Sequence, residues 1–76
     1  MLQSIIFDRK YFTPITATQW IIGHGYNHSK IDIKKNHLRF RQVEPIHGAR
    51  YATYKVTKGI EFILMSNDMI QQLQIV

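Results

Sequence analysis

The chain has 76 residues, a mass of 9.0 kDa, a formal net charge of +5 and no cysteine. A chain of this length forms one small basic domain over residues 1–76, which excludes a catalytic cleft backed by a second lobe, and the lack of Cys excludes disulfides, thiolate metal sites and a Cys nucleophile. A hydrophobic content of 45% excludes a disordered chain, and the longest apolar run, residues 62–65, is far too short to span a membrane.

The first third of the chain predicts one strand followed by one helix. Residues 2–7 are β-branched and aromatic enough for a strand. Thr13 and Pro14 are typical of a helix start, because Thr accepts from free backbone N–H groups and Pro lacks a donor that would have no partner there. Four residues recur at helical spacing, namely Ala17, Trp20, Ile21 and His24. Gly23 or Gly25 can take the left-handed conformation that ends a helix. We expect this helix to lie on a sheet, with its Trp in the core.

The next segment alternates with a period of two and predicts a hairpin. Residues 30–34 and 37–43 alternate between apolar and polar side chains, and residues 35–36 fit the turn between them. On the face toward the core we place Ile31, Ile33, Leu38 and Phe40. On the outer face we place Asp32, Lys34, His37, Arg39 and Arg41. The basic residues of this hairpin therefore share one side.

The last part of the chain predicts a second hairpin and a tail. Residues 44–49 are assigned to a loop, and residues 50–56 and 60–65 to strands whose connection places Gly59 at the left-handed position of a bulged hairpin. The tail, residues 66–76, favours a short helix over a further strand, with an apolar stripe of Met69, Ile70, Leu73 and Val76. The fold class is α+β, with one helix packed on a small, mostly antiparallel sheet of about four strands.

The positive charge is concentrated in the middle of the chain. Residues 30–58 carry eight Lys and Arg against two carboxylates, a net charge of +6, which exceeds the net charge of the whole chain. A surface formed by this segment would attract polyanions. The alternative is a charged face that only keeps the protein soluble.

The outer face of the basic hairpin is the strongest candidate site. If residues 50–56 pair with residues 37–43, the face is extended by Tyr51, Thr53 and Lys55. Guanidinium groups on such a face would contact phosphates, and the ring of Tyr51 or Tyr54 would stack on an unpaired base. The candidate nucleic-acid-binding residues are Lys34, His37, Arg39, Arg41, Tyr51 and Lys55.

A purely structural interpretation of the same residues is also open. In it, the Tyr51 ring packs flat on the sheet and has no ligand. Arg39 and Arg41 pair with Asp32 and Glu61 as ordinary cross-strand partners. The two interpretations differ in whether the guanidinium groups are already occupied.

A spaced pattern of single residues and short clusters runs through residues 5–64. It consists of Phe7, Lys10, Tyr11-Phe12-Thr13, Ala17, Trp20-Ile21, His24-Gly25-Tyr26, Leu38-Arg39-Phe40-Arg41-Gln42, Tyr51, Thr53, Lys55-Val56 and Gly59-Ile60. This pattern resembles a small domain family of tailed phages and large DNA viruses, found as a stand-alone protein and near capsid-maturation proteins. The resemblance implies a viral origin and a place in the virion or the host cytoplasm, in a family without an established activity. Residues 21–23, Ile-Ile-Gly, replace a basic run of that family, which favours a contact of the helix with another protein.

Metal and catalytic sites are not indicated. His24 and His28 are four residues apart, but Gly25 interrupts the helical face that they would share, and common structural zinc sites include thiolates. The carboxylates lie in separate elements, so no pair is placed to hold magnesium for a nuclease. His47 and Glu44 share a loop without a nucleophile turn or a glycine-rich oxyanion site. We expect no metal, no cofactor and no enzyme activity.

The sequence thus predicts a non-enzymatic basic module that engages nucleic acid, another polyanion or an acidic protein surface, with no membrane partner. The alternative is a structural or interaction protein, either capsid-associated or an inhibitor of a host factor, that forms a homo-oligomer or docks through apolar surface. This alternative is motivated by more apolar side chains than one helix and a small sheet can cover, namely Ile22, Ile63, Met65 and the stripe in the tail.

Overall fold

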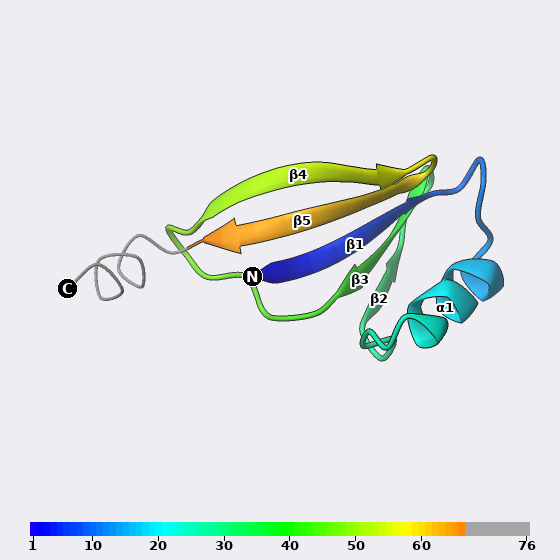
Figure 1. Ribbon diagram of the computed structural model, residues 1–76, viewed down its shortest axis with the longest axis horizontal. Coiled ribbons are helices and arrows are strands. Elements are labelled where there is room, and N and C mark those ends of the chain that lie inside the picture. Colours follow the sequence, from blue (N-terminus) through cyan, green and yellow to red (C-terminus); the bar gives the residue numbers. More distant parts are fainter. Residues whose placement is uncertain (67–76) are drawn as a thin grey trace.

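A computed structural model describes residues 1–66, in which one helix packs against one face of a five-stranded antiparallel sheet (Figure 1). The elements in chain order are β1 (Leu2–Asp8), α1 (Pro14–Gly23), β2 (Ile31–Ile33), β3 (His37–Arg41), β4 (Arg50–Thr57) and β5 (Ile60–Ser66). The predicted α+β class is confirmed, with five strands in this region in place of about four. The helix predicted for the tail lies outside the described residues, apart from Ser66, which ends β5.

The strand order in the sheet is β2-β3-β1-β5-β4, so the first strand of the chain lies in the centre. Phe7 of β1 is opposite Leu38 of β3 on one side and Ile60 of β5 on the other. The pairing of residues 50–56 with residues 37–43, considered from the sequence, is wrong. Among residues 1–66, β4 pairs with β5 alone, because β1 takes the place beside β3 and separates the two hairpins.

Helix α1 begins and ends as predicted. Thr13 is the N-cap, its Oγ1 accepts from the Thr16 N–H at 3.1 Å, and the Thr16 Oγ1 accepts from the Thr13 N–H at 2.9 Å. This reciprocal pair satisfies two backbone donors that the first helical turn cannot. At the other end His24 is the C-cap, and Gly25 follows with a positive φ of 78°.

The core lies between α1 and the centre of the sheet. The buried cluster comprises Ile5, Phe7, Ala17, Ile21, Leu38, Phe40 and Ile60. The Phe7 ring is central, with edge-to-face contacts to Phe12, Trp20 and Phe40 at centroid distances of 4.9, 5.7 and 5.5 Å. Trp20 is half-buried at the margin of this cluster. Burial of these rings supplies the main stabilising term for so small a domain.

The two faces of the basic hairpin are as predicted from its alternation. Ile31 lies opposite Phe40 and packs against the core, whereas Ile33, opposite Leu38 on the same face, is 57% exposed, so its predicted place in the core is wrong. The helix covers the β1 and β3 part of this face, whereas every residue of β4 is exposed (Figure 1). The face away from α1, which we call the open face, therefore carries the polar residues of the hairpin.

Candidate functional site

The open face gathers side chains from all five strands. The strand registers place on it Ser4, Ile6 and Asp8 of β1, Asp32 of β2, His37, Arg39 and Arg41 of β3, Tyr51, Thr53 and Lys55 of β4, and Glu61 and Ile63 of β5. These residues share one face because side chains alternate along each strand and directly opposed residues point to the same side. Cations and carboxylates are mixed on this face.

The six predicted site residues fall into three groups. His37, Arg39 and Arg41 lie together on β3. Tyr51 and Lys55 share their face but lie on β4, which β1 and β5 separate from β3. Lys34 follows β2 in the turn, where its backbone N–H donates to the His37 carbonyl and its own carbonyl accepts from Arg9 Nη1.

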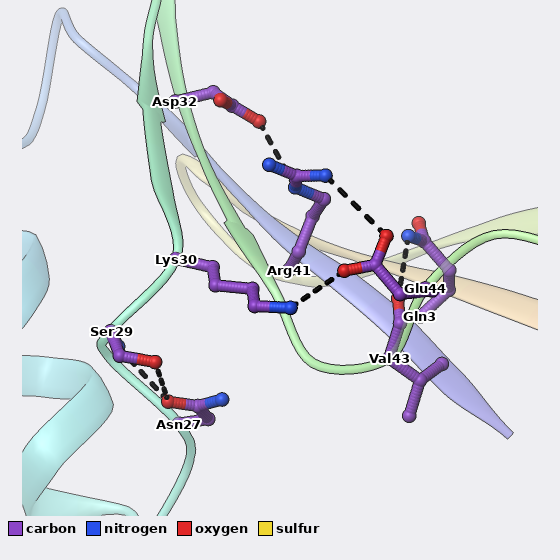
Figure 2. A network of polar contacts seen from close by, with 8 residues as sticks. All are labelled: Gln3, Asn27, Ser29, Lys30, Asp32, Arg41, Val43 and Glu44. Carbon is purple, nitrogen blue, oxygen red and sulfur yellow. Dashed lines mark hydrogen bonds and ion pairs between the residues drawn. The ribbon is translucent and has the colours of Figure 1, made fainter.

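Arg41 is held by two carboxylates (Figure 2). Its Nε lies 3.4 Å from Asp32 Oδ2 and its Nη1 lies 3.7 Å from Glu44 Oε2. The Nε is buried without a hydrogen bond within residues 1–66, so the contact with Asp32 is electrostatic. Part of the structural interpretation therefore holds, because Arg41 does pair with Asp32.

Glu44 also binds Lys30, with 2.6 Å between Oε1 and Nζ. The hydrogen bond and charge of Lys30, together with the charge of Arg41, lower the pKa of the Glu44 carboxyl below its ordinary value of 4.5. Glu44 is thus ionised at neutral pH. It links the loop after β3 to Lys30, which precedes β2, and to Arg41 at the end of β3. The loop is fixed to the edge of the open face.

Arg39 differs from Arg41 in its surroundings. It is partly buried, and within residues 1–66 its guanidinium has no ion pair and no hydrogen bond. Glu61, the second carboxylate of the structural interpretation, lies opposite Ile6 of β1 and Lys55 of β4. The guanidinium group of Arg39 is available to a ligand.

Three open hollows adjoin along the open face and continue onto one end of the sheet. The first, of about 500 Å³, includes Arg39, Arg41, Tyr51 and Thr53 in its lining, so it joins β3 to β4 across the two strands between them. The second, of about 290 Å³, shares Arg39 with the first. The third, of about 550 Å³, shares Asp8 and Asn36 with the second. We call this run of adjoining hollows the charged strip. The basic side chains and the histidine that line it are Arg41, Arg39, His37, Lys35, Lys10 and Arg9.

The end of the charged strip has the largest excess of positive charge. Its third hollow is lined by Arg9, Lys10 and Lys35 against the single carboxylate of Asp8. Asp8 Oδ1 accepts from the Lys10 backbone N–H at 2.8 Å, and the Arg9 backbone N–H donates to the Asn36 carbonyl at 3.1 Å. These bonds bring the segment after β1 against the β2–β3 turn.

The sequence interpretation missed this end of the strip. Arg9 and Lys10 were not among the predicted site residues, and Lys35 was assigned only to a turn. The available signal was the charge of these residues at strand ends, where antiparallel neighbours bring their turns together. The pairing of β1 with β3 was needed to place them side by side.

The histidines do not assemble into a metal site among the described residues, where no group of three or more His, Cys, Asp or Glu is placed to hold an ion. His24 instead stacks on Trp20, with ring centroids 3.8 Å apart, and its Nδ1 is 2.8 Å from the Trp20 carbonyl oxygen.

Membrane-spanning segments and related proteins were also sought. In residues 1–66 no helix is long and apolar enough to cross a membrane. No protein-family model, curated protein or solved structure matches this chain.

Proposed function

We propose that this chain is a non-enzymatic module that binds a polyanion along the charged strip, with single-stranded nucleic acid as the ligand. The observation that carries the proposal is the continuity of the strip from Arg41 to Arg9, with the unpaired guanidinium of Arg39 in its middle. From Arg41 to His37, β3 covers about 13 Å at about 3.3 Å per residue, and the β2–β3 turn with Lys35 follows at its end. This length suits an extended chain of several phosphates.

Arg39 is the central contact in this proposal. Its planar guanidinium has donors in a fork that fits phosphate oxygens, and within residues 1–66 it forms no ion pair with a carboxylate. Arg41 contributes less, because Asp32 and Glu44 already compensate its charge. Arg9, Lys10 and Lys35 add long-range attraction at the end of the strip.

The mixed charge of the open face favours a flexible strand over a duplex. Asp8, Asp32 and Glu61 lie among the cations, so a rigid row of phosphates would meet carboxylates as well. A single strand can turn its phosphates toward the cations and its bases toward Tyr51. The ring of Tyr51 is 47% exposed, and its hydroxyl donates to the Ile46 carbonyl at 3.3 Å, which fixes the ring for stacking.

Fluorescence anisotropy of a labelled oligouridine or oligothymidine tests the proposal. The affinity should fall with salt by about 0.7 log units per log unit of salt for each phosphate contacted, so three contacts give a slope of about −2. A double-stranded probe of the same charge should bind more weakly than the single strand. Absence of binding at low salt would contradict the proposal.

A charge-matched pair of variants locates the contact. Arg39→Gln and Arg50→Gln each remove one positive charge, but Arg50 lies on β4 and lines none of the three hollows. We expect Arg39→Gln to weaken binding more than tenfold, because a hydrogen bond to a charged group contributes about 1.5–3 kcal/mol and about 1.4 kcal/mol is tenfold. Arg50→Gln should weaken it by less than threefold. Equal losses would mean that only the net charge attracts the ligand.

A second candidate function is that of a structural or interaction protein that docks through apolar surface. It is favoured by Ile15 and Ile22 of α1, which are 71% and 55% exposed. Met65, which the sequence assigned to the same surface, is buried instead. If the helix is the docking surface, Ile22→Gln should abolish association in light scattering and leave oligonucleotide binding unchanged.

The viral origin and the location in the virion or host cytoplasm are proposals that rest on the residue pattern over residues 5–64 alone. A polyanion-binding module fits the nucleic-acid context that this pattern implies.

A further inference from the structure

One edge of the sheet is long and open, whereas the other is short. β4 forms the outer edge of the sheet next to β5 (Figure 1). All eight of its residues are exposed. β2, at the opposite edge, has only three residues. Proteins usually protect an edge by shortening it or by adding Pro, charges or bulges. β4 has no Pro, one Lys in its interior and a single irregularity, after Lys55.

The backbone bonds of β5 show which groups of β4 face outward. The Met1 N-terminus donates to the Met65 carbonyl at 3.1 Å, and the Met65 N–H donates to the Met1 carbonyl at 2.7 Å, so both backbone groups of Met65 point toward β1. At the other end of the β1–β5 ladder, the Asp8 N–H donates to the Gly59 carbonyl, so Gly59 also faces β1. Odd-numbered residues from 59 to 65 therefore bond to β1.

In an antiparallel ladder, a residue whose backbone groups point to one neighbour has none for the other. Met65, Ile63 and Glu61 are therefore the residues of β5 that bond to β1. Their opposite residues on β4 are Tyr51, Thr53 and Lys55, and these present their N–H and C=O groups to the outer edge. The β4 edge thus offers three donor and acceptor pairs at every second residue.

This edge is complementary to itself. In an antiparallel pair centred on Thr53, Thr53 meets its own copy, Tyr51 lies opposite Lys55 of the second copy, and Ala52 lies opposite Tyr54 of the second copy. The three outward-facing residues of each strand then exchange about six hydrogen bonds. Neither cation of β4 faces a cation, because Lys55 meets a Tyr ring, which attracts an ammonium group, and Arg50 meets Val56.

We propose that two copies of this chain associate through their β4 edges, in antiparallel register about Thr53, to form one continuous ten-stranded sheet. A two-fold axis perpendicular to the sheet puts the open faces of both copies on the same side, so two charged strips lie on one surface. The second copy is the occupant that this register favours, because it pairs all three outward-facing residues and opposes no two cations across the edge. The dimer does not depend on the function proposed above.

The interface is small, so the dimer should be concentration-dependent. One strand pair lies at the lower end of specific interfaces, which bury about 1,200 Å² or more. Light scattering of the full chain over a series of concentrations should show a monomer at the lowest concentrations and a dimer at the highest.

Single cysteine variants test the register, because the chain has no cysteine of its own. In Thr53→Cys the two introduced residues are directly opposite, with Cα atoms about 5.5 Å apart, which suits a disulfide. In the matched control Lys55→Cys, the two introduced cysteines are offset by four residues, which places them about 13 Å apart along the strands. With oxidised glutathione we expect cross-linked dimer from Thr53→Cys at least tenfold faster than from Lys55→Cys. Equal rates, or no cross-link in either folded variant, would overturn the register.

A proline variant tests the edge without opening the monomer. The Thr53 N–H points outward, so Thr53→Pro removes no hydrogen bond within the sheet, and circular dichroism verifies that the chain still folds. We expect Thr53→Pro to be monomeric at every concentration, whereas Thr53→Val, which keeps the N–H, and Ile22→Gln on the helix still dimerise. A dimer that survives Thr53→Pro but is lost in Ile22→Gln would overturn the proposal in favour of the helix. A wild-type chain that stays monomeric at the highest concentration would overturn it as well.

Discussion

Asp32 lies directly opposite Arg39 in the ladder between β2 and β3, but its carboxylate lies beside the diagonal neighbour, with Oδ2 3.4 Å from Arg41 Nε. Glu44 approaches Arg41 from the other side. Two arginines that point the same way from one strand therefore differ in charge compensation. Arg41 forms part of the scaffold of the open face, and Arg39 is left to a ligand.

Removal of the Asp32 charge should tighten polyanion binding. Asp32→Asn frees Arg41 from one of its two carboxylates and removes a repulsive charge from the first hollow of the strip. The pair is partly exposed, and exposed pairs contribute about 0.2–1 kcal/mol, so we expect affinity for a single-stranded oligonucleotide to rise about twofold to fivefold. The gain should disappear at high salt. Weaker binding by Asp32→Asn would show that Arg41 needs this carboxylate for its position.

The stability contributed by Glu44 should be lost in acid. Lys30 and Arg41 lower the pKa of Glu44 in the folded chain, so its contribution to the free energy of unfolding is present above the ordinary value of 4.5 and is lost as the pH falls through the lowered pKa. Urea unfolding, followed by Trp20 fluorescence, should show wild type more stable than Glu44→Gln at neutral pH and the two alike in strong acid. A difference independent of pH would contradict this assignment.

Gly59 and Gly48 form a matched pair for the turn after β4. Both have a positive φ, 82° and 83°, but a Cβ at Gly59 would lie 2.9 Å from Tyr11 Cδ2, whereas a Cβ at Gly48 would meet nothing within 4 Å. Gly48→Ala should lower the free energy of unfolding by about 1–2 kcal/mol through backbone strain alone. Gly59→Ala should cost about 1–3 kcal/mol more, because the side chains of Tyr11 and Phe12 must move. Equal losses in urea unfolding would show that Tyr11 yields without cost.

Local patterns were sufficient to predict the elements. Alternation in residues 30–43 gave the correct faces for Arg39 and Arg41, because one shift in register would expose Leu38 and Phe40. Thr13 gave the helix start because its capping bonds involve only near neighbours in the chain. Gly59 gave the turn for the same reason.

The arrangement of these elements was not predictable in the same way. Periodicity does not encode which strand lies between the two hairpins, so the central place of β1 and the distance from Arg39 to Tyr51 required the structure. The meeting of Arg9 and Lys35 depends on the pairing of β1 with β3, which is non-local. The choice of Asp32 between Arg39 and Arg41 depends on side-chain rotamers, which no sequence pattern specifies.

The most direct test of the charged strip is a titration of ¹⁵N-labelled protein with a short oligouridine, followed by backbone amide chemical shifts. The strip predicts that the largest shifts occur at His37, Arg39, Lys35, Lys10 and Arg9, with small shifts along α1. Shifts confined to the exposed side of α1, around Ile15 and Ile22, would contradict the account.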